Sequence, residues 1–167
     1  DNWLDSVFNM VSASTTTGYG TTTMENLNPI AFTTIIIAMI IGGCGFSTTG
    51  GIKILRFMEL AKVRQIFYKK FTRISESDKK GIISGIIILA PLLILPLLVA
   101  AYMGSIGYNL QNAFFDGVSA ITGTGHGAGT ISFALDPIIT IVFGIMMILG
   151  KAELVLIVYM FAPKLMK

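Results

Sequence analysis

Three long stretches almost free of charge constrain this chain more than any other feature. They are residues 29–41, 81–103 and 137–162, and only Lys151 and Glu153 bring charge into them. A membrane-spanning helix needs about 20 residues, so the chain has room for about three spans with their connections. Charged residues make up 13% of the chain, where soluble domains carry about 25%. We therefore expect an all-α membrane protein.

The first and third stretches carry helix-start signals. Each begins at a proline that follows a capping side chain, Asn28 or Asp136. The second contains two prolines, which membrane helices tolerate when neighbouring groups satisfy the freed carbonyls. Residues 2–13 and 109–121 are mildly apolar but too short to cross. We expect them to form short re-entrant helices on the outer side.

The charges predict the topology. Nine of the twelve basic residues lie in 53–80, and Lys164 and Lys167 close the chain. This bias places the 53–80 connection and the C-terminus in the cytoplasm. A nucleic-acid partner is not expected, because aromatic residues do not interleave with the basic ones at any regular spacing. The single Cys44 excludes an internal disulfide. The chain opens on Asp1 rather than Met, so we expect a fragment of a longer polypeptide.

An internal repeat carries the functional information. Residues 8–23 and 115–130 align at an offset of 107 with nine identities in sixteen positions. Each copy consists of a short apolar segment, a Thr/Gly-rich loop and one of the long apolar stretches. We call residues 15–20 (TTTGYG) the first loop and residues 122–127 (TGTGHG) the second loop.

The chemistry of these loops favours ion binding by the backbone. They contain no nucleophile pair and no metal-ligand cluster, but they supply consecutive carbonyls and glycines that permit unusual dihedral angles. Potassium channels use TVGYG loops from four units to replace the hydration shell of the ion with carbonyl oxygens. The alternative is a pair of tight membrane turns, but a turn needs only two or three such residues.

The chain resembles the Trk/Ktr/HKT superfamily of potassium transporters. The most specific strings are SASTTTGYG (12–20), GGCGFSTTGGIK (42–53), SAITGTGHG (119–127) and GKAEL (150–154). The resemblance implies four fused, channel-like helix–pore-loop–helix units, of which about one and a half are present. Residues 1–72 correspond to the pore loop and broken inner helix of the third unit, with a cytoplasmic extension. Residues 73–167 correspond to the whole fourth unit.

The resemblance also implies a selectivity filter. Its carbonyls would bind K⁺ and come from Thr16, Thr17, Gly18, Gly123, Thr124 and Gly125. Tyr19 and His126 would stand at the outer mouth, where we expect His126 to be exposed rather than to sense protons. The chain departs from the family pattern twice. Lys151 stands where an arginine is usual, and Gly123 stands where the first loop has Thr16; both bear on ion selectivity.

Residues 42–51 (GGCGFSTTGG), which we call the glycine-rich segment, should interrupt the first long helix. Each glycine costs a helix about 1 kcal/mol relative to alanine. A helix from Pro29 reaches Gly43 about 21 Å below the outer surface, still inside a hydrocarbon core of about 30 Å. We expect this segment to obstruct the ion path; the alternative is a hinge without a gating role. The expected gate residues are Gly42, Gly43, Gly45, Ser47, Thr48, Thr49, Gly50, Gly51 and Lys151.

Lys151 reaches the same depth, counted along the helix that begins at Pro137. A charge inside the membrane is a candidate functional residue. Glu153 cannot pair with it, because only positions three or four apart meet on a helix. We expect the ammonium to donate to carbonyls of the glycine-rich segment; the alternative is a lysine that extends to the cytoplasmic edge of the membrane.

These features predict potassium uptake across the cell membrane. A sodium-permeable relative, or a non-conducting structural or receptor subunit, is the alternative. An intramembrane enzyme using His126 is disfavoured, since the acidic Glu153 lies at the opposite membrane level. No cofactor is expected in this chain, and K⁺ is the transported ion. The expected partners are the lipid bilayer, a second copy in a homodimer and, by resemblance, a cytoplasmic nucleotide-binding regulatory subunit like those of the Trk and Ktr systems.

Overall fold

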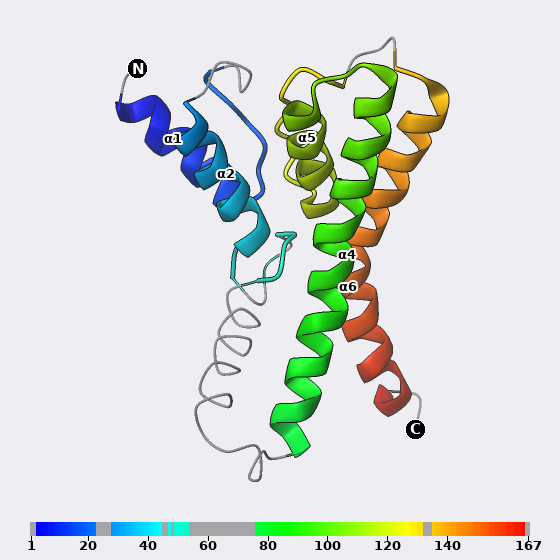
Figure 1. Ribbon diagram of the computed structural model, residues 1–167. Helices are drawn as coiled ribbons and strands as arrows, with labels where there is room; N and C mark the ends of the chain where they lie inside the picture. The colour runs from blue at the N-terminus through cyan, green and yellow to red at the C-terminus, as the bar shows by residue number, and fades with distance from the viewer. Residues whose placement is uncertain are drawn as a thin grey trace, which may run out of the picture.

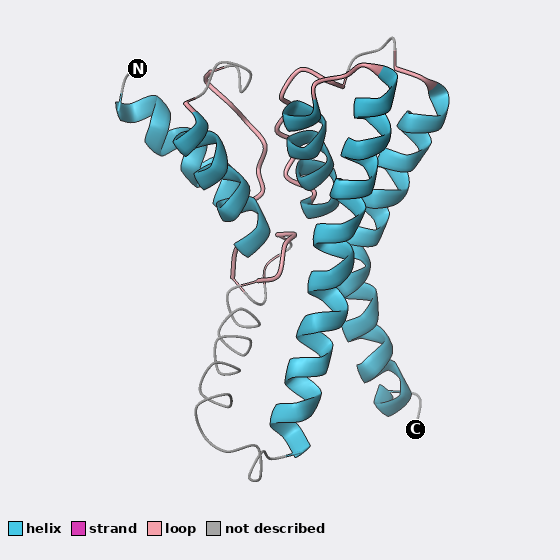
Figure 2. Cartoon of the chain, viewed as in Figure 1, coloured by secondary structure: helices cyan, strands magenta, loops and turns pink. Residues whose placement is uncertain are grey.

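A computed structural model describes residues 3–22, 28–44, 47, 49–53, 76–131 and 135–165, with only the backbone course for 76–89 and 152–165. Figure 1 shows the arrangement of the helices. They are α1 (Trp3–Ser14), α2 (Pro29–Ile41), α4 (Glu76–Ile106), α5 (Leu110–Thr122) and α6 (Pro137–Leu165). No β-strand occurs within these residues (Figure 2). The expectation of an all-α fold is confirmed over the described part of the chain.

The helix starts follow the predicted caps. The Ile30 amide donates to Asn28 Oδ1 at 3.3 Å at the start of α2. The Ile138 amide donates to Asp136 Oδ1 at 3.2 Å at the start of α6. Helix α2 has the predicted bounds, whereas α4 extends beyond the predicted 81–103 at both ends. Capping side chains therefore fix where these helices begin, as the sequence indicates.

Helix α5 packs against both α4 and α6, and it ends about halfway along α4 (Figure 1). It approaches α4 closely at Gly117, where a Cβ would lie 3.1 Å from the Cα of Pro96. The buried core here is apolar and includes Val99, Met103, Ala113, Ile121, Phe143 and Met146. This core holds the short helix α5 against the two long helices.

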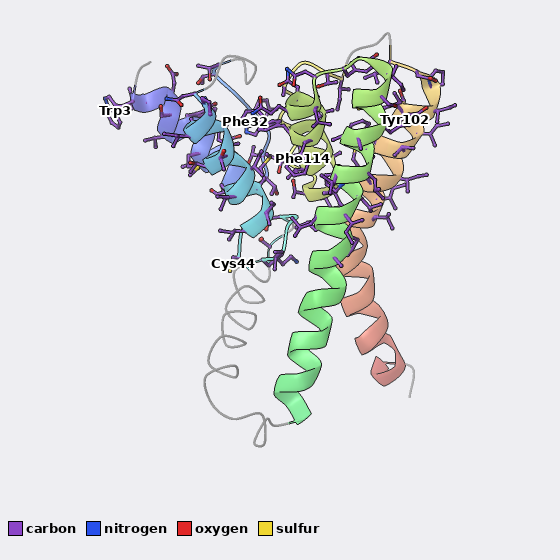
Figure 3. All side chains as sticks on the ribbon, in the orientation of Figure 1. Trp3, Phe32, Cys44, Tyr102 and Phe114 are labelled. Carbon is purple, nitrogen blue, oxygen red and sulfur yellow. The ribbon has the colours of Figure 1, made fainter. Side chains whose placement is uncertain are left out.

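Helices α1 and α2 join this assembly through a second apolar cluster. It consists of Ala13, Ile35, Met39, Phe115, Val118 and Ala128. The rings of Phe32, labelled in Figure 3, and Phe115 have centroids 4.8 Å apart. The cluster contains residues of α1, α2, α5 and the chain after the second loop. It therefore holds the helices that carry the two Thr/Gly loops together.

Where the side chains of α4 and α6 are described, many of the exposed ones are large and apolar. Exposed side chains include Leu93, Leu97, Leu98, Ile138, Ile141 and Ile148. A helix that is apolar all round belongs in an apolar environment rather than in water. Within the residues that the structure describes, no helix is both long and apolar enough to cross a membrane.

Some predictions fall outside the described residues. They are the boundary between 72 and 73, most of the basic connection at 53–80, and the expected gate residues Gly45 and Thr48.

Candidate functional site

The two Thr/Gly loops leave their helices with matching geometry. The hydroxyls of Thr15 and Thr17 lie 2.8 Å apart in the first loop, and those of Thr122 and Thr124 lie 2.8 Å apart in the second. The hydroxyls of Thr15 and Thr122 also donate to carbonyls four residues back, at 2.7 and 2.8 Å. These hydroxyls are thus used in hydrogen bonds within their own loop and helix, and the hydrogen bonds are equivalent in the two copies of the repeat.

The loops meet at their central glycines. Gly18 has φ +84° and Gly125 has φ +86°, a region that side chains rarely adopt. A Cβ at Gly18 would overlap the carbonyl oxygen of Thr124, and a Cβ at Gly125 would lie 4.0 Å from the Cα of Gly18. The expectation that the glycines of these loops adopt unusual dihedral angles is confirmed for Gly18 and Gly125. Backbone contacts backbone here, with no room for a side chain at Gly18.

The residue two positions before each central glycine is also left-handed, with φ 52° at Thr16 and 64° at Gly123. In the first loop, the Thr16 hydroxyl accepts a hydrogen bond from the Gly50 amide at 3.3 Å. In the second loop, Gly123 has no hydroxyl to offer. The two expected filter positions are therefore equivalent in backbone conformation but different in chemistry.

The glycine-rich segment leaves the helical conformation immediately after α2. Its described residues are non-helical, and the chain folds back so that the Ile52 amide donates to the Ile40 carbonyl at 2.9 Å. The predicted break in the helix is confirmed over these residues. The Ser47 and Thr49 hydroxyls are hydrogen-bonded to each other. Cys44, labelled in Figure 3, is exposed.

Gly50 links the glycine-rich segment to both loops. It donates to Thr16, as above, and a Cβ at Gly50 would overlap the carbonyl oxygen of Thr122. Figure 1 shows the segment below the lower end of α5. The structure therefore brings one of the expected gate residues, Gly50, next to Thr16 of the first loop and Thr122 of the second.

Lys151 lies at the same end, on α6. At the preceding residue, a Cβ on Gly150 would overlap the Ile121 carbonyl oxygen, so α6 and the last turn of α5 are in close contact. The Lys151 ammonium extends toward Gly123, where a Cβ would lie 3.2 Å from Nζ. The carbonyl end of a helix attracts cations. The α5 terminus thus offers the ammonium a favourable position; its donation to the glycine-rich segment stays a prediction.

The expectation that His126 is exposed is wrong. His126 is 3% exposed, whereas the equivalent Tyr19 is 72% exposed. The Ala128 amide and the Thr130 amide both donate to Asp116, which draws this part of the chain onto the buried face of α5. Burial lowers the pKa of His126 from its ordinary value of 6.5. Within the described residues, its Nε2 has no hydrogen-bond partner.

Sequence reasoning missed two buried polar residues that hold the loops. Asn9 on α1 accepts from the Thr21 amide at 3.1 Å, and Asp116 on α5 accepts from the Ala128 amide at 2.6 Å. The two residues occupy equivalent positions in the repeat, but one is asparagine and the other is aspartate. An alignment that counts only identical residues therefore does not detect them. The available signal is a polar residue at the same place in both copies.

Comparison with known proteins identifies the family. The family model named TrkH, described as a cation transport protein, matches residues 1–166. The chain belongs to the TrkH family. It is also 31% identical, over 171 residues, to an uncharacterized cation transporter of Methanocaldococcus jannaschii. That match covers 95% of this chain but only 36% of the relative, so the chain spans about a third of the relative's length. The description of this family is cation transport, not an enzymatic activity.

Proposed function

We propose that the whole TrkH protein containing this chain transports potassium ions across the cell membrane, and that the two loops form half of its selectivity filter. The observation that carries this proposal is the contact of Gly18 with the Thr124 carbonyl, both loops having a left-handed glycine there. A dehydrated cation needs closely spaced oxygens in exchange for its water. Two backbones in contact supply such oxygens without any ionisable side chain.

The residues that would hold K⁺ are those expected from the sequence. They are Thr16, Thr17, Gly18, Gly123, Thr124 and Gly125. Tyr19 and His126 follow toward the outer side in this arrangement. The other half of the filter would come from two further units of the full-length protein, so that four helix–pore-loop–helix units surround one path.

We further propose that the glycine-rich segment and Lys151 close the inner end of this path. The contacts of Gly50 with both loops support this proposal. The carbonyl end of α5 favours a cation nearby. The Lys151 ammonium occupies that position, and it would compete with the transported ion for it.

The assembly is part of the same proposal. The full-length protein would be a homodimer in the plasma membrane, with a cytoplasmic nucleotide-binding regulatory subunit. The basic 53–80 connection would be cytoplasmic and would offer that subunit a docking surface. The charge bias and the family resemblance support this arrangement.

Ion flux into vesicles tests the proposed function. The full-length protein is reconstituted into liposomes, and uptake of K⁺ and Na⁺ is measured under equal gradients, with empty liposomes as control. The proposal predicts protein-dependent uptake that favours K⁺. Equal uptake of both ions would indicate a sodium-permeable transporter, and no uptake of either would indicate a structural or receptor subunit; both results would contradict the proposal.

A further inference from the structure

Each loop is attached to its own short helix at a point beyond the filter residues. The attachment is made by Asn9 on α1 and by Asp116 on α5, which are 3% and 0% exposed. Their partners lie 12 to 14 residues further along the chain. A buried polar side chain normally has its hydrogen bonds satisfied, and both residues satisfy theirs with the chain that leaves the loop.

Asn9 uses both functions of its amide. Its Oδ1 accepts from the Thr21 amide at 3.1 Å, and its Nδ2 donates to the Thr22 hydroxyl at 2.9 Å. A hydroxyl can donate as well as accept. If position 9 carried a carboxylate, the Thr22 hydroxyl could rotate and donate to it, so both contacts would survive.

Asp116 has no such freedom. The Ala128 amide donates to Oδ1 at 2.6 Å, and the Thr130 amide donates to Oδ2 at 3.1 Å. These two donors are backbone amides, which cannot reverse their role. An asparagine at position 116 would turn its NH₂ group toward one of these amides, because it has only one acceptor oxygen. One donor would be left buried and unpaired.

We infer that Asn9 and Asp116 are positioning residues that fix the outer ends of the two filter loops, and that only Asp116 must be a carboxylate. This inference rests on the proposed function, since it assumes that the loops select the ion. The filter carbonyls lie between the end of each helix and its attachment point. Loss of an attachment would let them move apart, and a wider site discriminates less between K⁺ and Na⁺.

The test exchanges the two side chains in the full-length protein. Asp116→Asn is compared with Asn9→Asp in liposomes, with the K⁺/Na⁺ uptake ratio as readout. Leaving a buried hydrogen-bond donor unpaired shifts an equilibrium about tenfold. We expect the K⁺/Na⁺ uptake ratio of Asp116→Asn to be at least about tenfold lower than that of Asn9→Asp. Equal losses in the two variants would overturn the inference.

Two further measurements keep the inference testable. Asn9→Leu removes both contacts at position 9 and should lose more of the ratio than Asn9→Asp; equal ratios in these two would contradict the inference even if Asp116→Asn does not reach the membrane. Hydrogen–deuterium exchange of the amides of Ala128 and Thr130 reports the attachment directly, and it should accelerate in Asp116→Asn. Faster exchange with an unchanged ratio would refute the positioning role.

The exchange measurement also separates this inference from the proposed function. If the wild-type protein shows no preference for K⁺, the proposed function fails, whatever the amides do. If the wild type prefers K⁺ but the amides of Ala128 and Thr130 exchange equally fast in wild type and Asp116→Asn, the attachment is wrong and the proposed function stands.

Discussion

The end of the Lys151 side chain lies beside Gly123. A Cβ at Gly123 would lie 3.0 Å from Cε and 3.2 Å from Nζ of this lysine, closer than ordinary van der Waals contact. In the first loop, the equivalent Thr16 carries a side chain, and its hydroxyl binds the Gly50 amide. The two departures from the family pattern, a lysine for an arginine and a glycine for a threonine, are therefore neighbours in space.

This contact predicts that positions 123 and 151 are coupled. Gly123→Thr should destabilise the protein, because the new side chain meets Lys151 and because a non-glycine residue in the left-handed region costs about 1–2 kcal/mol. Adding Lys151→Ala should recover the steric part. Thermal unfolding of both single variants and the double variant gives the coupling free energy. Gly127→Thr is the control, because a Cβ there meets nothing within 4 Å. If the stability changes of the two single variants simply add up in the double variant, the contact between positions 123 and 151 is contradicted.

Lys151→Ala should increase ion flux, because it removes the cation at the carbonyl end of α5. Lys151→Arg should keep the path closed, since it retains the charge. The rate at which a thiol reagent modifies Cys44, which is exposed, separates two explanations. Faster modification in Lys151→Ala would mean that the lysine tethers the glycine-rich segment. An unchanged rate would mean an electrostatic barrier alone. Unchanged flux would exclude both. Cys44→Ser gives the background rate.

Gly50→Ala should displace the glycine-rich segment from the second loop. A Cβ there would overlap the Thr122 carbonyl, and overpacking of this kind costs about 1–3 kcal/mol. We expect a lower unfolding temperature together with faster flux, since the segment would no longer block the loops. Gly144→Ala on α6 is the matched control, because its Cβ would meet nothing within 4 Å. Slower flux in Gly50→Ala would contradict the gating role.

His126 predicts a pH dependence of stability. Burial lowers its pKa in the folded protein below 6.5, so the unfolded chain takes up a proton first as the pH falls. The folded state should therefore lose stability as the pH drops through about 6.5, by at most about 1.4 kcal/mol per pH unit. Unfolding temperatures measured between about pH 7.5 and pH 5.5 check this. His126→Gln should lose this part of the pH dependence, and an identical profile in the variant would contradict it.

The local features of this protein could be predicted from its sequence. The caps Asn28 and Asp136, the bounds of α2 and the left-handed glycines Gly18 and Gly125 follow from short-range chemistry. Prolines, capping side chains and glycines act within a few residues of their own positions, so a single sequence reveals them. The break of α2 into the glycine-rich segment is of the same kind.

The contacts between elements could not be predicted in this way. Counting residues from Pro137 gives the depth of Lys151, but not the side of α6 that meets Gly123. The burial of His126 goes with the hydrogen bonds that Asp116 accepts from the amides of Ala128 and Thr130, two and four residues further along the chain. Asn9 and Asp116 are not identical, so the repeat alone does not reveal their common role. Each of these relationships depends on which elements pack together.

The K⁺/Na⁺ uptake ratio of Gly18→Ser and Gly125→Ser tests the central claim most directly. Gly107→Ser is the matched control, because Gly107 has φ +107° and open space around its Cβ but lies in the turn between α4 and α5. If the two loops form the filter, both loop variants lose the preference for K⁺ or lose uptake, while the full-length protein stays in the membrane and Gly107→Ser keeps the preference. A wild-type ratio in both loop variants would contradict the account.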